Sequence, residues 1–184
     1  MKKIIYTKVG GLEAIDIIDQ EKKNIGEREV RVRVHRAGIN FADLMMRQGL
    51  YGASPDFPFT PGYEVSGEVT EIGKLVSKVS LNDRVIAIPG FGGYSEEIVI
   101  TENRVIMIPE KMTYDQAASI PVTYGTAFHM LVHLGCIKKG DVILIHHAAG
   151  GVGTAAAQIC NAYGASLIIG TASSKKKDFV ESLG

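Results

Sequence analysis

The chain has 184 residues, 46% of them hydrophobic and 22% charged, as in a folded globular protein with one domain or one and part of a second. Its 20 basic residues balance 20 acidic ones, so no net field favours nucleic acid or an anionic membrane surface. No apolar run approaches the roughly 20 residues of a membrane helix. Neither a signal peptide nor a disulfide framework is indicated, and we expect a cytoplasmic location.

The first hundred or so residues predict short strands separated by turns. Apolar and polar residues alternate over 30–35 and 63–70, which is the period of a half-buried strand. Further strands are expected at 84–88, 98–100 and 104–108. Frequent strands and turns are typical of a barrel or a sandwich. One helix is expected among them, with Asn40 as its N-cap, Asp43 at its third position and an end by Gly49.

Helices and strands alternate after Pro109. Thr113 and Gln116 resemble a capping box that opens a short helix before Pro121. The expected elements after it are helix 122–134 with Gly135 in the left-handed position beyond its end, strand 142–145, helix 152–163, strand 166–169 and helix 175–183. The apolar run 142–145 is continuous, which predicts a strand buried on both faces. This order predicts the opening of a doubly wound α/β fold.

The turn after strand 142–145 has the form A-x-G-x-x-G, a variant of the dinucleotide-binding fingerprint with Ala148 in the first glycine place. Gly150 would let the main chain approach a pyrophosphate, and Gly153 would let helix and strand pack closely. The start of the helix offers N–H groups and the positive end of the helix dipole to a phosphate. The alternative is a tight turn in an α/β protein that binds no nucleotide.

The residues after strand 166–169 bear on which nucleotide is bound. An NAD site usually carries an acidic residue about 20 positions after the glycines. Here the sequence has no acid over 170–177, but hydroxyl side chains and three lysines. Serine and lysine would bind a 2′-phosphate that a carboxylate would repel, so NADPH is favoured over NADH. The alternative is a solvated basic first turn of a helix.

Six segments occur in one order along the chain: AGINFAD at 37–43, RQGLY at 47–51, PGYEVSG at 61–67, GGYSE at 92–96, PVTYGTA at 121–127 and AAGGVG at 148–153. Together they are similar to the zinc-free quinone oxidoreductases (zeta-crystallin-like) of the medium-chain dehydrogenase/reductase superfamily, over essentially the whole chain. The resemblance implies an α/β protein with a β-rich domain. A GroES-like, partly open barrel over 1–112 would precede the first half of a Rossmann doubly wound parallel sheet over 113–184.

The resemblance also implies roles for individual residues. Tyr51 would contact the nicotinamide and the substrate and is the only catalytic candidate. Asn40 would lie near the nicotinamide, and Thr126 would hydrogen-bond its carboxamide or a phosphate. The pyrophosphate would lie against Gly150, Gly151, Val152 and Gly153, and the 2′-phosphate against Ser173, Ser174 and Lys177. The alternatives are an N-cap for Asn40, packing against prolines for Tyr51 and an ordinary helix position for Thr126.

No metal site is expected. In the zinc alcohol dehydrogenases of the superfamily, cysteine holds the place of Asn40 and histidine that of Tyr63, and Glu64 alone cannot bind zinc. A four-cysteine structural lobe is missing as well. His129 and His133 are spaced i, i+4 on a helix, but no pattern supplies a third ligand.

The implied reaction is hydride transfer from NADPH to a quinone or an enone, without zinc. Only 44 residues follow Gly140, enough for half of a dinucleotide-binding domain. The chain therefore looks like an amino-terminal piece, and the alternative function is a catalytically incompetent fragment that acts as a nucleotide-binding or interaction module. The strand 142–145 would then have an unpaired edge and the lone chain marginal stability. A complementary carboxyl-terminal polypeptide or a second copy is a candidate partner. His147, where the family usually has a small residue, could crowd the glycine turn or face the cofactor.

Overall fold

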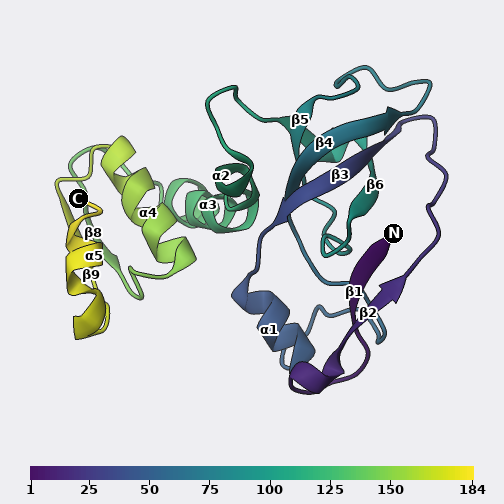
Figure 1. Cartoon of the computed structure of the whole chain (residues 1–184). Coiled ribbons are helices and arrows are strands. Elements are labelled where there is room, and N and C mark those ends of the chain that lie inside the picture. The colour runs from purple at the N-terminus through teal and green to yellow at the C-terminus, as the bar shows by residue number, and fades with distance from the viewer. The chain divides into compact units, whose positions relative to one another are not determined.

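The computed structural model describes all 184 residues, which divide into two compact units, Met1–Ser119 and Ile120–Gly184. The first unit contains nearly all the strands (Figure 1). Its elements are, in order, β1 (Lys2–Tyr6), β2 (Ile15–Asp19), β3 (Glu29–Ala37), α1 (Phe41–Arg47), β4 (Val65–Ile72), β5 (Arg84–Ala87), β6 (Glu97–Thr101), β7 (Val105–Met107) and α2 (Tyr114–Ala118). Short 3-10 turns cover Leu12–Ala14 and Glu102–Arg104.

Five strands form one curled antiparallel sheet in the order β6-β3-β4-β5-β7, and β1 pairs with β2 as a separate hairpin. The five strands expected from the sequence are all present, and the sheet confirms the predicted half-barrel. Its core is made of β-branched side chains that alternate along the strands, among them Val30, Val32, Val65, Val69 and Val85. The hairpin β1–β2 was not among the predicted strands.

Arg31 of β3 is buried, although buried and exposed side chains are expected to alternate along this strand. Its two neighbours, Val30 and Val32, are buried as well. Its guanidinium lies 2.8 Å from Glu71 and 3.6 Å from Glu97, and it donates to the carbonyl of Lys23 at 2.6 Å. These partners replace the water that the charge loses on burial.

Helix α2 begins with the predicted capping box. The N–H of Gln116 donates to the Thr113 hydroxyl at 3.2 Å, and the Thr113 N–H donates to the Gln116 side-chain oxygen at 3.0 Å. The helix packs against β3, β4 and β5, and Tyr114 stacks on His35 with ring centroids 4.4 Å apart. The compact units therefore divide after α2 and not before it. The assignment of domains to 1–112 and 113–184 stays a prediction.

The second unit is a β-α-β-α arrangement preceded by a helix. It contains α3 (Pro121–Phe128), a π-helical segment (His129–Leu134), β8 (Val142–Ile145), α4 (Gly151–Ala162), β9 (Leu167–Gly170), a 3-10 turn (Ser174–Lys176) and α5 (Lys177–Glu181). Strands β8 and β9 are parallel and in register from Val142–Leu167 to Ile145–Gly170. Small buried residues of α4 (Ala155, Ala156, Ala157 and Cys160) form the core with Ile145. This confirms the predicted parallel βαβ unit.

The expected continuous α-helix over 122–134 is wrong in its second half, which is a π-helix. The N–H of Gly135 bonds to the carbonyl of Met130, five residues earlier, at 2.8 Å. Gly135 is also not the left-handed residue, since its φ is −81° and Cys136 has a φ of +49°. A Cβ at Gly135 would lie 3.0 Å from the carbonyl oxygens of Met130 and Leu131. Close backbone approach therefore explains this glycine.

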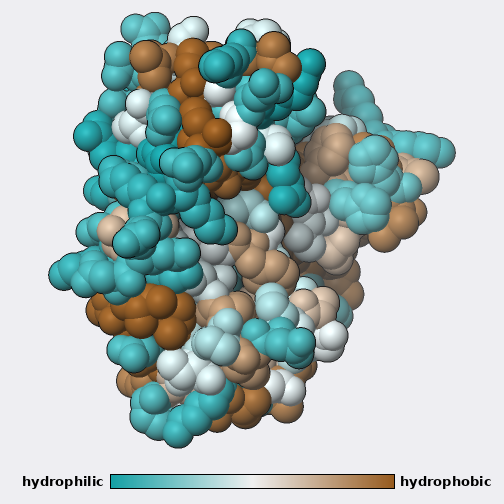
Figure 2. Space-filling model, turned by 90° about the vertical axis from the view of Figure 1, so that its right-hand side faces the viewer, coloured by the Kyte–Doolittle hydropathy of each residue, from teal (hydrophilic) through white to brown (hydrophobic).

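Strand β8 is buried on one face only, contrary to the prediction from its continuous apolar run. Val142 and Leu144 are 61% and 56% exposed, and Leu167 and Ile169 of β9 are 52% and 45% exposed. We call these four residues the open sheet face. Figure 2 is a view from the right-hand side of Figure 1, onto the first unit, and shows hydrophobic patches among hydrophilic side chains there. No helix in the structure has the length and apolar character needed to cross a membrane.

Candidate functional site

The turn between β8 and α4 is a strand-to-helix bend with main-chain amides at its end. His147 has a φ of +54°, and its carbonyl accepts a hydrogen bond from the Gly150 N–H at 2.8 Å. Gly150 is the N-cap of α4, and the N–H of Thr154 closes the first turn onto its carbonyl at 2.8 Å. The first N–H groups of a helix have no partner within the helix. Three of these amides are those of Gly151, Val152 and Gly153.

The three glycines of this turn differ in how closely other atoms surround them. A Cβ at Gly153 would lie 2.4 Å from the carbonyl oxygen of His147, so only glycine permits the observed packing of helix on turn. A Cβ at Gly151 would lie 3.0 Å from Thr123 Cγ2 of α3. A Cβ at Gly150 would meet only the His147 oxygen, at 3.2 Å. The packing of the protein thus requires Gly153, whereas a Cβ at position 150 would meet this one backbone oxygen alone.

Thr171, at the end of β9, ties the glycine turn to the segment that follows β9. Its carbonyl accepts from the Ala148 N–H at 3.0 Å, and its own N–H donates to the carbonyl of Ile145 at 2.9 Å. Its hydroxyl lies 3.1 Å from Nδ1 of His146. The carboxyl ends of the two parallel strands are therefore joined at the edge where open α/β sheets bind ligands. The sequence pattern gave no signal for this bridge.

The three residues expected at a 2′-phosphate follow this bridge and are exposed. The carbonyl of Ser173 accepts from the Lys176 N–H at 2.9 Å, which opens the short 3-10 turn that contains Ser174. Lys177 begins α5, and its ammonium lies 3.6 Å from the Glu181 carboxylate, with both side chains mostly in solvent. Such a pair is weak. The lysine is thus free to exchange Glu181 for a more strongly charged anion.

Thr126 is exposed on α3, one turn beyond Thr123, whose methyl group lies closest to Gly151. Helix α3 is fixed on α4 by a hydrogen bond from the Tyr124 hydroxyl to the Gln158 side chain at 2.7 Å. The structure therefore brings all the predicted nucleotide-binding residues of the second unit onto three adjacent segments.

Asn40, in the first unit, belongs to a buried polar network. Its main-chain N–H donates to Asp43 Oδ2 and its side-chain amide to Glu64 Oε1, both at 2.8 Å. The Tyr94 hydroxyl donates to the same Asp43 oxygen at 2.8 Å, and burial together with this carboxylate raises the pKa of Tyr94. Asn40 is 9% exposed and Asp43 and Glu64 are 1% exposed. The side chain of Asn40 is thus held in a fixed orientation, and it occupies the N-cap position as well.

Tyr51 lies in the loop after α1 and is 38% exposed. Ser54 fixes the backbone there, because its N–H and its hydroxyl both donate to the Tyr51 carbonyl, at 3.2 and 2.9 Å. Burial raises the pKa of Tyr63 to about 12, and the Tyr63 hydroxyl donates to the sulfur of Met46 at 3.8 Å. The catalytic role of Tyr51 and the alternative of packing against prolines both stay predictions. Tyr63 is a functional residue candidate that the sequence analysis considered only as an absent zinc ligand.

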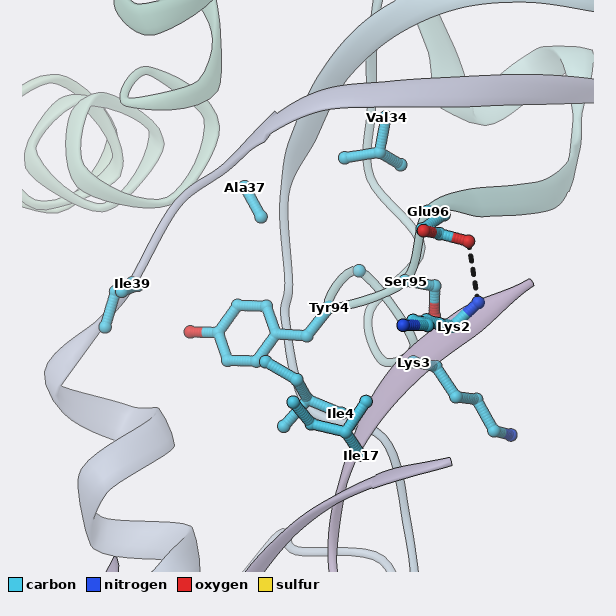
Figure 3. Close-up of a pocket in the computed structure, with 11 residues that line it drawn as sticks. Lys2, Lys3, Ile4, Ile17, Val34, Ala37, Ile39, Tyr94, Ser95 and Glu96 are labelled. Carbon is cyan, nitrogen blue, oxygen red and sulfur yellow. Dashed lines mark hydrogen bonds between the residues drawn. The ribbon is translucent and has the colours of Figure 1, made fainter. Parts of the chain in front are cut away.

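A cavity of about 490 Å³ lies in the first unit and contains none of the predicted site residues. Figure 3 shows the Tyr94 ring at its centre, with Ile4, Ile17 and Ala37 around it. At one side the Lys2 N–H donates to Glu96 Oε2 at 2.7 Å (Figure 3). The structure holds no group of three or more His, Cys, Asp or Glu side chains placed to bind a metal ion.

Comparison with known proteins places these features in a family. Residues 26–110 match the alcohol dehydrogenase GroES-like domain. A quinone oxidoreductase of Sus scrofa is 38% identical over 96% of this chain and 54% of its own length. The crystal structure of Escherichia coli quinone oxidoreductase complexed with NADPH superposes with a TM-score of 0.92 at 31% identity, covering 100% of this chain and 56% of that one. The chain is a relative of the quinone oxidoreductases of the medium-chain dehydrogenase/reductase superfamily.

Other proteins similar to this chain carry different names. The synaptic vesicle membrane protein VAT-1 homolog of Danio rerio is 36% identical over 100% of this chain and 38% of its own length. The chain thus spans about half the length of the curated proteins it matches. Its GroES-like unit and its βαβ unit are the parts on which the candidate site residues lie.

Proposed function

We propose that the chain is part of an NADPH-dependent oxidoreductase that transfers a hydride to a quinone or an enone without zinc. The observation that carries this proposal is the strand-to-helix bend at 146–153, where Gly150 is the N-cap of α4 and the first amides of the helix have no partner within it. The quinone oxidoreductase relatives support the reaction class, and the NADPH complex of the Escherichia coli neighbour supports the cofactor. NADPH, when bound, supplies the hydride.

The residues present fit the two phosphate groups of this cofactor. The amides of Gly151, Val152 and Gly153 would bind the pyrophosphate, aided by the positive end of the α4 dipole. Ser173 and Ser174 would donate hydroxyl hydrogen bonds to the 2′-phosphate, and Lys177 would neutralise its charge. Thr126 would hold the nicotinamide carboxamide or a phosphate.

The first unit would supply the residues near the reacting carbon. Asn40 would lie at the nicotinamide, held in place by Glu64. Tyr51 would donate a hydrogen bond to the carbonyl oxygen of the acceptor, where negative charge develops during reduction. Water can supply the proton that completes the reduction, so no further general acid is required.

Zinc is not needed in this proposal, and the residues at the relevant positions are poor zinc ligands. Asn40 uses its amide in a hydrogen bond to Glu64, and the phenol of Tyr63, with its pKa raised to about 12, stays protonated at neutral pH. Zinc prefers thiolate, imidazole or carboxylate ligands.

A second candidate function is that of a nucleotide-binding or interaction module without catalysis. The open sheet face favours it, because exposed apolar strands of this kind bind another polypeptide. The partner would be a complementary carboxyl-terminal polypeptide or a second copy of the chain. We propose a cytoplasmic location for either function, based on the two isolated cysteines.

Titration of NADPH fluorescence, followed by NADPH oxidation with 1,4-benzoquinone, tests the proposal. We expect saturable binding of NADPH that is tighter than that of NADH, and turnover that added chelator does not reduce. Binding without turnover would select the nucleotide-binding module. A folded protein that binds neither nucleotide would contradict both functions.

A further inference from the structure

Two exposed histidines, His129 and His133, lie next to each other on the π-helical segment that follows α3. Their ring centroids are 5.5 Å apart, and the ring planes meet at an angle of 43°. Neither residue belongs to the candidate functional site. A role for this pair is therefore independent of the proposed function.

The π-helical geometry holds one of the two rings in place. The ring of Phe128 meets that of His133 at an angle of 74°, with centroids 5.5 Å apart. These residues are five positions apart, whereas neighbours on an α-helix are three or four apart. The main-chain bonds of a π-helix join residues five apart, as the bond from Gly135 to Met130 does. The π-helical turn thus brings Phe128 against His133 and limits the rotation of the His133 ring.

The spacing of the two rings fits a shared metal ion. A Zn–N bond of about 2.0 to 2.1 Å and a tetrahedral angle would hold two imidazole centroids about 5.2 Å apart. The observed separation of 5.5 Å is close to this value. Convergence of one nitrogen from each ring requires only rotation of exposed side chains. π-Helical turns are also rare in proteins and frequent at functional sites.

We propose that His129 and His133 form a binding site for a divalent transition-metal ion, with water molecules completing the coordination. The ion belongs to the class that imidazole nitrogens suit, which includes Zn²⁺, Ni²⁺ and Cu²⁺. Once bound, it would link two positions of the π-helical segment and stabilise this turn. The structure places no third His, Cys, Asp or Glu side chain at the pair. The site would therefore bind more weakly than a structural zinc site with four protein ligands.

The first arm of the test titrates Zn²⁺ into the untagged chain without nucleotide, followed by calorimetry. We expect saturable binding of one ion per chain. His129→Gln and His133→Gln should each raise the Kd about tenfold or more, because loss of a ligand costs at least as much as loss of a partner behind it. The control His147→Gln removes an exposed histidine outside the pair and should leave the Kd unchanged. Absence of zinc binding, or an equal loss in His147→Gln, overturns the inference.

The second arm locates the ion in the unaltered protein. The histidines carry 13C at Cε1, and the signals of His129 and His133 are assigned by their loss in the two variants. We expect Zn²⁺ to shift these two signals and to leave that of His35 in place. A zinc-dependent shift at His146 or His147, with the signals of the pair unmoved, overturns the inference. Both arms are run without nucleotide or quinone, so their outcomes and those of the proposed function are separate.

Discussion

His147 adopts a backbone conformation that glycine usually supplies, at the centre of the candidate nucleotide site. Its φ of +54° brings its carbonyl onto the Gly150 N–H. The expectation that its side chain crowds the turn or faces a cofactor stays a prediction. What the structure adds is strain in its main chain, because a left-handed conformation costs a residue with a Cβ about 1 to 2 kcal/mol.

We therefore expect His147→Gly to raise the free energy of unfolding by about 1 kcal/mol, since the strain in the main chain is relieved. Urea denaturation followed by circular dichroism measures this change. The control Ala149→Gly lies two residues away, at a position without positive φ, and should destabilise the protein. Equal effects of the two substitutions would contradict the strain.

Gly150 and Gly153 allow a matched comparison of binding and packing. A Cβ would meet the His147 carbonyl oxygen at 2.4 Å from position 153 and at 3.2 Å from position 150. We expect Gly153→Ala to lower stability by about 1 to 3 kcal/mol, as overpacking does. Gly150→Ala should change stability little but weaken NADPH binding at least tenfold, because its methyl group occupies the phosphate space. Thermal melts and fluorescence titrations distinguish these outcomes, and unchanged NADPH affinity in Gly150→Ala would refute the phosphate site.

Lys177 should determine the preference for the phosphorylated cofactor. Its ion pair with Glu181 is exposed and therefore weak. Replacing it by glutamine should weaken NADPH binding about tenfold, the cost of one charge-assisted hydrogen bond, and leave NADH affinity unchanged. Lys176→Gln, one residue earlier, serves as the control. Equal losses for NADPH and NADH would show that Lys177 does not read the 2′-phosphate.

Among the elements, the strands of the first unit could be predicted because their valines alternate and face one core. The hairpin β1–β2 could not, since its burial does not alternate along either strand. The π-helical segment His129–Leu134 has no sequence signature, because hydrogen bonds five residues apart depend on how the helix end packs. A glycine after an ordinary α-helix is usually left-handed, and this was the prediction for Gly135. After the π-helical segment Gly135 instead allows a close approach to two carbonyl groups.

The candidate site divides in the same way. The glycine turn could be predicted, because its spacing is fixed by a local bend between one strand and one helix. The bridge through Thr171 joins this residue to His146, 25 residues earlier in the chain. It could not be predicted, because it depends on the pairing of β8 with β9.

A contact that depends on pH joins the 3-10 turn Glu102–Arg104 to the loop between β4 and β5. Buried Glu102 accepts hydrogen bonds from the N–H groups of Ser77 and Lys78 at 2.8 and 2.9 Å, and these lower its pKa. Because the folded pKa lies below the unfolded value of about 4.3, the contribution is present above that pH. It is lost as the pH falls through the folded pKa.

Glu102→Gln should accordingly lower Tm at pH 7, and the difference from the unaltered protein should shrink as the pH falls below about 4. Differential scanning calorimetry over a pH series measures it. Glu110→Gln, which changes an exposed carboxylate, provides the comparison and should have little effect at any pH. A deficit in Tm that persists unchanged at the lowest pH would contradict the stabilising role of the Glu102 charge.

At the scale of the whole molecule, the open sheet face combines with a formal net charge of zero. Neither like-charge repulsion nor a covering helix then opposes association through the apolar strands. We expect the chain to self-associate at micromolar concentration near pH 7, as measured by sedimentation velocity. The double variant Leu144→Lys, Ile169→Lys should shift it toward monomer.

A suitable control for this prediction is Leu134→Lys, because Leu134 is 70% exposed but lies outside the two strands. It adds positive charge without changing the open sheet face. Dissociation by this variant to the same extent would attribute the effect to charge alone. A monomeric chain at all concentrations would show that the open sheet face does not drive association.

The bridge through Thr171 has a consequence for altering coenzyme preference. The same residue that supports the glycine turn begins the segment that would distinguish a phosphorylated ribose from a plain one. Replacing the segment after β9 by that of an NADH-dependent protein would therefore also disturb the glycine turn, unless Thr171 were kept. A change of coenzyme preference would therefore have to keep Thr171 and alter only the residues after it.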